Sequence, residues 1–273
     1  DPSWAESESS DDFAIQIFKL NTEKQIGTVV HSYALSGANM KDHIRYFSYI
    51  LQNFNIVMVV GDYAGGVQFV SACNESEIFK QDKLQLKIIE ADFERPENYN
   101  DDLQKARNQY NKNESKICYL RKPTSNWIRQ ANELLQSNLD HSRIFFASKA
   151  IDESYQVQRR KRIPIDKLKY LKSKDSIEKM SKEAKMIDFI EHQSDMIELT
   201  KVECALIQIT TTSQGTQTFD LPSNLKRQSG RDKARKDSYS ALVLGNWMIK
   251  TYFDMLNFKQ KEVVSTFTPM FIN

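Results

Sequence analysis

The chain has 273 residues, of which 40% are hydrophobic and 27% are charged, and its formal net charge is +2. This composition is typical of a folded domain with a sizeable core and argues against a disordered or fibrous chain. No apolar run reaches 18 residues and no signal-peptide pattern is present, so we expect no membrane contact. The three cysteines are scattered without CxxC spacing, which argues against a zinc site.

The first part of the chain predicts a hairpin followed by a strand–helix–strand unit. Residues 12–20 and 26–35 are extended runs around a short turn, which is typical of an antiparallel hairpin. Residues 40–54 carry apolar side chains at helical spacing, and residues 84–93 form a further extended run. This order indicates an α/β fold with a mixed sheet, which has an antiparallel half, a parallel half and flanking helices.

Between these elements, the run Ile56–Val60 contains no polar residue. We expect it to form a central strand that is covered on both faces. Gly61 and the pair Gly65–Gly66 then allow the backbone to turn into a helix. Asp62 would therefore stand at the carboxyl end of a central strand, where open α/β sheets place their ligand sites. The simpler interpretation is that Asp62 caps the helix that follows.

The second part of the chain carries mainly helical signals. Residues 101–200 are predicted to be mostly helical, and residues 205–212 are rich in β-branched side chains that favour a strand. Residues 213–222 suit a turn and a short extended piece, and residues 236–257 form a final amphipathic helix. Since no repeat or low-complexity linker interrupts the sequence, we expect one domain over residues 1–273, with residues 101–200 as a helical elaboration.

Positive charge is concentrated in two segments of this nearly neutral chain. Residues 155–182 hold ten Lys or Arg against three acids, and residues 224–236 hold six against one. Clustered cations indicate a polyanionic partner, because each phosphate that they neutralise releases bound counterions. The alternative is a solvated charged face. No GxxxxGK[ST] loop is present, so we expect no P-loop ATPase in this chain.

Three acids stand at the ends of predicted elements, namely Asp1, Asp62 and Asp237. Clustered carboxylates are costly unless a cation neutralises them, and Mg²⁺ and Mn²⁺ prefer such oxygen ligands. Two such ions can together hydrolyse a phosphodiester. Spacing alone leaves open whether the three acids converge, because Asp237 can equally be an acid favoured at a helix start. Asp12 and Asp220 are alternative ligands.

Three blocks of sequence occur in order along nearly the whole chain: DPSWAESESSDDFAIQIF, VVGDYAGGVQFVSA, and GTQTFDLP with RDKARKDSYSALVLGNWMIK. Together they resemble the nuclease domain of the large terminase subunit of tailed bacteriophages. The resemblance implies an RNase H-like fold and a nuclease that cuts concatemeric viral DNA during packaging. It also implies that Asp1, Asp62 and Asp237 are the catalytic ligands of two Mg²⁺ or Mn²⁺ ions, with water as the nucleophile.

The same resemblance implies partners and a location. The partners would be double-stranded DNA, a terminase ATPase domain, a small terminase subunit and a portal protein, acting at the procapsid in the host cytoplasm. In the family a strand leads into the first acid, whereas this chain begins at Asp1 without a methionine. We therefore expect the chain to be a fragment that lacks the upstream strand and the ATPase domain.

The sequence thus predicts a metal-dependent DNA endonuclease, with the two basic segments positioning the phosphate backbone. One alternative is another RNase H-like nuclease, such as a junction resolvase or a transposase core. Another is a non-catalytic module that docks DNA or the portal. The residues expected to contact the backbone are Arg159, Arg160, Lys161, Arg162, Arg231, Lys233, Arg235 and Lys236.

Overall fold

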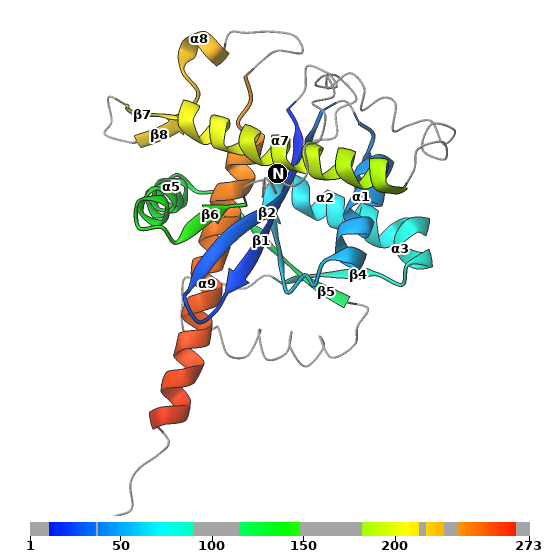
Figure 1. Cartoon of the computed structure of the whole chain (residues 1–273). Helices are drawn as coiled ribbons and strands as arrows, with labels where there is room; N and C mark the ends of the chain where they lie inside the picture. The colour runs from blue at the N-terminus through cyan, green and yellow to red at the C-terminus, as the bar shows by residue number, and fades with distance from the viewer. Residues whose placement is uncertain are drawn as a thin grey trace, which may run out of the picture.

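A computed structural model describes residues 11–36, 38–89, 115–147, 182–212, 217–226 and 234–265. Two three-stranded sheets and a two-stranded ribbon are formed within these segments. Helices cover the three-stranded sheets from both sides, so the chain has the mixed α/β architecture that was predicted (Figure 1). No helix in these segments is long and apolar enough to cross a membrane.

The first sheet is built on the predicted hairpin. Strands β1 (Phe13–Asn21) and β2 (Ile26–Leu35) pair antiparallel, with a register shift between Ile17 and Phe18. The short strand β6 (Ile144–Phe146) pairs parallel with β2, which gives the order β1-β2-β6. This sheet contains both antiparallel and parallel pairs, so the prediction of a mixed sheet is confirmed.

The second sheet is entirely parallel. Its strands are β3 (Val59–Asp62), β4 (Gln85–Ile89) and β5 (Ser115–Arg121), in the order β3-β5-β4. In this described sheet β3 is an edge strand and all four of its residues are half-buried. The predicted central position of the strand before Asp62 was therefore wrong, and only the last two residues of the Ile56–Val60 run enter the sheet. The predicted cover on both faces is confirmed, since Val59 and Val60 pack against two different hydrophobic clusters.

The central strand of this described sheet is β5 instead. Its residues from Ile117 to Leu120 are all buried. Cys118 and Leu120 belong to one hydrophobic cluster, and Tyr119 between them belongs to another. The sequence analysis assigned this region to helices and missed β5. An apolar run of four residues between charged ones is too short to distinguish a strand from a helix by periodicity.

One face of the sheets is covered by α1 (Met40–Asn53), α2 (Tyr63–Glu75) and α3 (Glu77–Gln81), seen at the right of Figure 1. The predicted helix over residues 40–54 is thus confirmed. The pair Gly65–Gly66 lies inside α2 rather than in a turn before it. A Cβ on Gly66 would lie 2.6 Å from a methyl of Leu120, so this glycine lets α2 pack closely onto β5.

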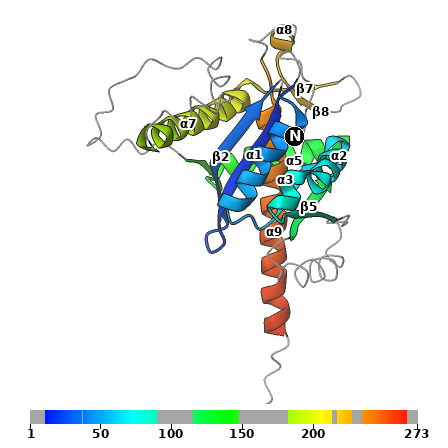
Figure 2. The same cartoon turned by 90° about the vertical axis from the view of Figure 1, so that its right-hand side faces the viewer.

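The opposite face is covered by α5 (Ser125–Asp140) and α9 (Asp237–Ser265), while α7 (Lys182–Leu206) lies across β2. In both views α9 passes the sheets and its C-terminal half projects beyond them (Figures 1 and 2). A side chain at Gly245 would collide with the ring of Phe18, so this glycine allows α9 to approach β1. The predicted final helix is confirmed.

The remaining elements form a small ribbon at one end of the molecule. Strand β7 (Gln208–Thr211) pairs antiparallel with β8 (Gln217–Asp220), and the short helix α8 (Ser223–Lys226) follows. The strand predicted over residues 205–212 is shorter than expected, because its first two residues complete α7. All four residues of β7 are exposed, which explains why the pattern of buried side chains could not define its start.

Candidate functional site

The two predicted ligands that the structure describes stand at the ends of packed elements. Asp62 is the last residue of β3, and Asp237 is the first residue of α9. Met58, just before β3, packs in a hydrophobic cluster that contains Met248 of α9. Val60 packs against this cluster and also against a second one, which contains residues from the first turns of α9. Strand β3 therefore runs antiparallel to α9, toward the end at which the helix begins. This direction brings Asp62 to the same end of the molecule as Asp237.

Asp62 is half-buried and caps α2. Its Oδ1 accepts a hydrogen bond of 3.3 Å from the backbone N–H of Ala64. The simpler interpretation of the sequence, that Asp62 is an N-cap, is therefore confirmed. A cap of this kind engages one carboxylate oxygen, so it is compatible with a second role for the other oxygen.

Asp237 is buried, with 8% of its surface exposed. Its Oδ2 accepts a 2.7 Å hydrogen bond from the backbone N–H of Asp12, which joins the start of α9 to the start of β1. Burial raises the pKa of Asp237 to about 6, and the carboxylates of Asp11 and Asp12 add to this rise, while the Asp12 N–H and Arg235 oppose it. A nearby cation would therefore favour the charged form of this carboxylate.

Asp12, an alternative ligand in the sequence analysis, is the acid that the structure brings to Asp237. It is 6% exposed, and its Oδ1 lies 3.1 Å from Nη1 of Arg235. The side chain of Arg235 is only 14% exposed. Arg235 thus contributes to the internal structure at the start of α9, and its predicted contact with a phosphate backbone stays a prediction.

A third buried acid in this region was missed by the sequence analysis. Glu203, near the end of α7, is 3% exposed, and its Oε2 accepts a 2.9 Å hydrogen bond from the backbone N–H of Tyr239. Burial raises the pKa of Glu203 to about 8, and the nearby Asp237 and Asp12 add to the rise. The available signal was a lone acid within the otherwise apolar stretch at residues 202–207.

Asp220, the other alternative ligand, is engaged by lysines. Its Oδ2 lies 2.6 Å from Nζ of Lys226, and its Oδ1 lies 3.0 Å from Nζ of Lys236. Partial burial alone would raise its pKa, but the hydrogen bonds from these two lysines lower the pKa of Asp220 below its usual value. Lys236 remains more than one-third exposed, and its predicted contact with DNA stays a prediction.

The other predicted site residues lie outside the described segments. These residues are Asp1, Arg159, Arg160, Lys161, Arg162, Arg231 and Lys233. Among the residues that are described, no group of three or more His, Cys, Asp or Glu side chains is arranged to hold a metal ion. The structure therefore describes two of the three predicted metal ligands, and their convergence with Asp1 stays a prediction.

No family model, curated protein or solved structure matched the chain. The resemblance to terminase nucleases thus depends on the sequence blocks alone. The RNase H-like assignment likewise stays a prediction within the mixed α/β class that the structure shows.

Beside Asp62, strand β5 ends on Arg121, which the sequence analysis did not consider. The two residues are aligned in the parallel β3–β5 ladder. The guanidinium of Arg121 lies 5.5 Å from the ring centroid of Trp127 and 5.1 Å from that of Trp247. Because β5 was not predicted, its carboxyl end could not be recognised as a neighbour of Asp62.

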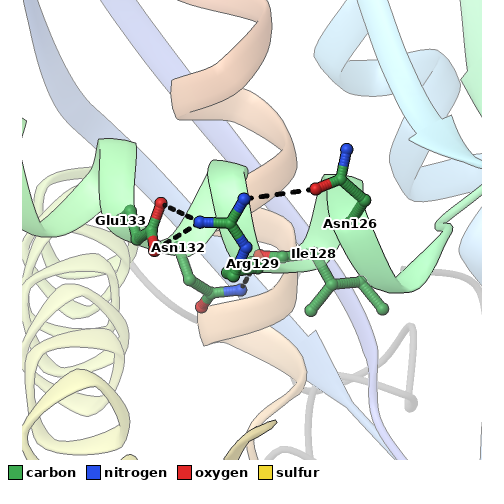
Figure 3. A network of polar contacts seen from close by, with 5 residues as sticks. All are labelled: Asn126, Ile128, Arg129, Asn132 and Glu133. Carbon is green, nitrogen blue, oxygen red and sulfur yellow. Dashed lines mark hydrogen bonds and ion pairs between the residues drawn. The ribbon is translucent and has the colours of Figure 1, made fainter. Parts of the chain in front are cut away.

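The arginine on the surface of α5 has different surroundings (Figure 3). Arg129 makes hydrogen bonds of 2.9 and 3.0 Å to Glu133 and one of 3.2 Å to Asn126, all within the same helix. The neighbouring Asn132 instead accepts a hydrogen bond from the hydroxyl of Tyr239 on α9. Arg129 is thus a helix-surface ion pair, whereas Arg121 lies against aromatic rings at the end of a strand.

Proposed function

We propose that the chain is a metal-dependent nuclease that hydrolyses phosphodiester bonds in DNA. The observation that supports this most is the placement of Asp62 and Asp237 at the ends of β3 and α9, which pack together and run in opposite directions. Carboxylates at the carboxyl end of a parallel strand stand where α/β proteins bind their ligands. Asp62 stands at such an edge, and the hard carboxylate oxygens of Asp62 and Asp237 suit Mg²⁺ or Mn²⁺.

The local structure holds each carboxylate in place. The Asp12 N–H engages Oδ2 of Asp237, so Oδ1 is the atom that can take a ligand. The Ala64 N–H donates to Oδ1 of Asp62, so Oδ2 of Asp62 is the atom that can bind the metal ion. A bound divalent ion would supply activation of a water molecule and stabilisation of the charge on the leaving oxygen. The buried pair of Asp12 and Arg235 keeps the start of α9 fixed against β1.

The narrower form of the proposal is a terminase nuclease domain that cuts concatemeric double-stranded viral DNA. In this form Asp1 completes the site for two ions, and the protein works with an ATPase domain, a small subunit and a portal in the host cytoplasm. The three sequence blocks support it, and the mixed α/β architecture agrees with it.

The test is cleavage of supercoiled plasmid in Mg²⁺ or Mn²⁺, with EDTA as the metal-free control. The variants are Asp62→Asn and Asp237→Asn, which keep a hydrogen-bond acceptor but remove the charge. The matched control is Asp42→Asn, an exposed acid of α1 that pairs with Arg45. We expect each site variant to lower the cleavage rate at least about 100-fold, since metal ligands stabilise the transition state directly. The control should cleave like the parent.

The results also distinguish the alternatives. Parent cleavage that persists in both site variants would contradict the proposed ligands. Parent binding to DNA that needs no metal, with no cleavage in either metal, would favour a docking module. Preferential cutting of a four-way junction over linear duplex would favour a resolvase-like nuclease over the terminase form.

A further inference from the structure

The chain leaves β3 and β5 at the same edge of the parallel sheet. Asp62 and Arg121 are the last residues of these strands, and they are aligned partners in the ladder, where neighbouring strands lie about 4.8 Å apart. Tyr63 follows Asp62, and Lys122 follows Arg121. Since consecutive Cα atoms are about 3.8 Å apart, the Cα atom of Lys122 lies within about 9 Å of that of Asp62. Tyr63 and Lys122 are therefore neighbours of a proposed metal ligand.

Lys122 carries a charge that no described acid neutralises. Its side chain is exposed, and it forms no ion pair within the described segments. Other exposed cations, such as Arg45, Lys80 and Arg129, pair with acids three or four residues away on their own helices. A lysine without such a partner can neutralise a phosphate group and release its counterions. Lys122 thus places a positive charge near Asp62 that is available to an anionic ligand.

Tyr63 begins an apolar strip on the exposed side of α2. Tyr63 and Val67 are one helical turn apart, so they share a face of the helix, and they are 41% and 38% exposed. Within the described part of the chain, the ring of Tyr63 makes no aromatic contact and its hydroxyl makes no hydrogen bond. An exposed ring beside a cation is the combination that holds single strands of nucleic acid, because bases stack on the ring while the cation contacts the backbone.

We propose that Lys122 contacts a phosphate group, and that Tyr63 stacks on an unpaired base, of the DNA strand that passes Asp62. The substrate is then opened at this point, with at least one nucleotide unpaired. The position of this strand relative to the cut rests on the proposed nuclease function, in which Asp62 binds a metal ion. The competing explanation is that Lys122 and Tyr63 are ordinary surface residues without a ligand.

Binding of the full chain to fluorescein-labelled DNA, measured by anisotropy, tests the role of Lys122. The probes are a single-stranded oligonucleotide and its duplex, with Ca²⁺ in place of Mg²⁺ and the salt concentration varied. The variant is Lys122→Gln, and the matched control is Lys24→Gln, an exposed lysine in the turn between β1 and β2. We expect Lys122→Gln to weaken binding of both probes about tenfold and to reduce the slope of log K against log salt by about 1. The control should match the parent.

The same probes test the ring of Tyr63. Tyr63→Leu keeps an apolar side chain but removes the ring, so binding of the single strand should weaken at least about fivefold. The salt slope should not change, since no charge is lost. The duplex should be affected less, because its bases are already stacked on one another. Tyr63→Phe keeps the ring and should bind like the parent.

Both residues are exposed, so the variants should fold, and a urea titration of each preparation verifies this. If Lys122→Gln binds both probes like Lys24→Gln, the phosphate contact is overturned. Equal binding of the single strand by Tyr63→Leu and the parent overturns the stacking contact.

Cleavage by the same variants keeps this proposal apart from the nuclease proposal. Losses of binding in Lys122→Gln and Tyr63→Leu, in a chain that cleaves with neither metal, would support the DNA contact and contradict the nuclease. Cleavage by a parent whose two variants bind DNA as the control does would leave the nuclease in place and overturn the DNA contact. Absence of DNA binding by the parent would overturn it as well.

Discussion

Two groups of polar side chains in this molecule differ in their burial and in their partners. The first, which we call the α9 cluster, comprises Asp12, Glu203, Arg235 and Asp237, all largely buried and joined to one another or to the α9 backbone. The second, the β3–β5 edge, comprises Asp62 and Arg121, both half-buried at the ends of strands. The α9 cluster fixes the start of the helix, whereas Asp62 at the β3–β5 edge caps α2 through one carboxylate oxygen only.

The electrostatics of the two groups differ in the same way. In the α9 cluster burial raises the pKa of both Asp237 and Glu203, so their charged forms are disfavoured by the surroundings. The N-terminus of α9 offsets part of the cost of a buried carboxylate, because the backbone N–H of Tyr239 donates a hydrogen bond to Glu203. Changes of Asp12, Glu203 or Arg235 should therefore alter mainly stability, whereas changes of Asp62 should alter mainly activity. Asp237 contributes to both, since its Oδ2 joins β1 and its Oδ1 is a proposed metal ligand.

The largest difference should appear when Asp62 is changed to Asn. Cleavage should fall at least about 100-fold, while the free energy of unfolding changes by less than about 0.5 kcal/mol, because Asn is as good a cap as Asp. Plasmid cleavage and urea unfolding of the same preparation measure both quantities. A large loss of stability would show that the β3–β5 edge is structural, like the α9 cluster.

The next largest effect should follow the change of Asp12 to Ala. It removes the carboxylate that lies 3.1 Å from the largely buried Arg235, and breaking a buried ion pair by removing one of its members costs about 3 kcal/mol. Urea unfolding measures the loss. The matched control is Asp42→Ala, whose exposed pair with Arg45 should contribute about 0.5 kcal/mol or less. Equal effects in the two variants would contradict the structural role of the α9 cluster.

A smaller effect should follow the change of Gly66 to Ala beneath the β3–β5 edge. The new Cβ would lie 2.6 Å from a methyl of Leu120, so either the Leu120 side chain or α2 must shift, and overpacking of this kind costs about 1–3 kcal/mol. The control is Gln68→Ala on the exposed face of α2, which should leave stability nearly unchanged. A neutral or stabilising result for Gly66→Ala would show that α2 packs more loosely than described.

The smallest effect is a dependence of stability on pH. Between pH 6.5 and 8 the folded state keeps a proton on Glu203, whereas the unfolded state has already released it, since its pKa is then near the usual 4.5. Unfolding therefore releases a proton, and the free energy of unfolding should fall as pH rises, by up to about 1.4 kcal/mol per pH unit. Glu203→Gln should flatten this slope in urea titrations. Below pH 6.5 a second group acts in the opposite direction. Burial lowers the pKa of His43 to about 4, so in that range its titration makes the free energy of unfolding rise with pH.

The hairpin, α1, α5 and α9 could be predicted from the sequence because their signals are local. Apolar side chains at helical spacing place Ile44, Phe47 and Leu51 on the buried face of α1, as expected. The cap at Thr124 starts α5 within the region that was predicted to be mostly helical. The N-cap role of Asp62 is also local, because it depends only on a strand end followed by a helix.

The site could be predicted only in part. The sequence showed that Asp62 and Asp237 are acids at the ends of elements. It did not show which residues contact Asp237. Asp12 lies 225 residues away in the chain, and no local pattern reports a hydrogen bond across that distance. The alignment of Arg121 with Asp62 was hidden for a similar reason, since the pairing of parallel strands depends on a crossover and not on adjacent residues.

By itself, the sequence determined which segments form the hairpin and the main helices, because periodicity and caps act over a few neighbouring residues. Only the tertiary structure decided that β5 is the central strand of the parallel sheet and that β3 lies at an edge of the described sheet. It also decided which acids are buried together at the start of α9. Burial and strand order arise from packing between distant segments, so the side chains that share an environment in this protein are not those that share a stretch of sequence.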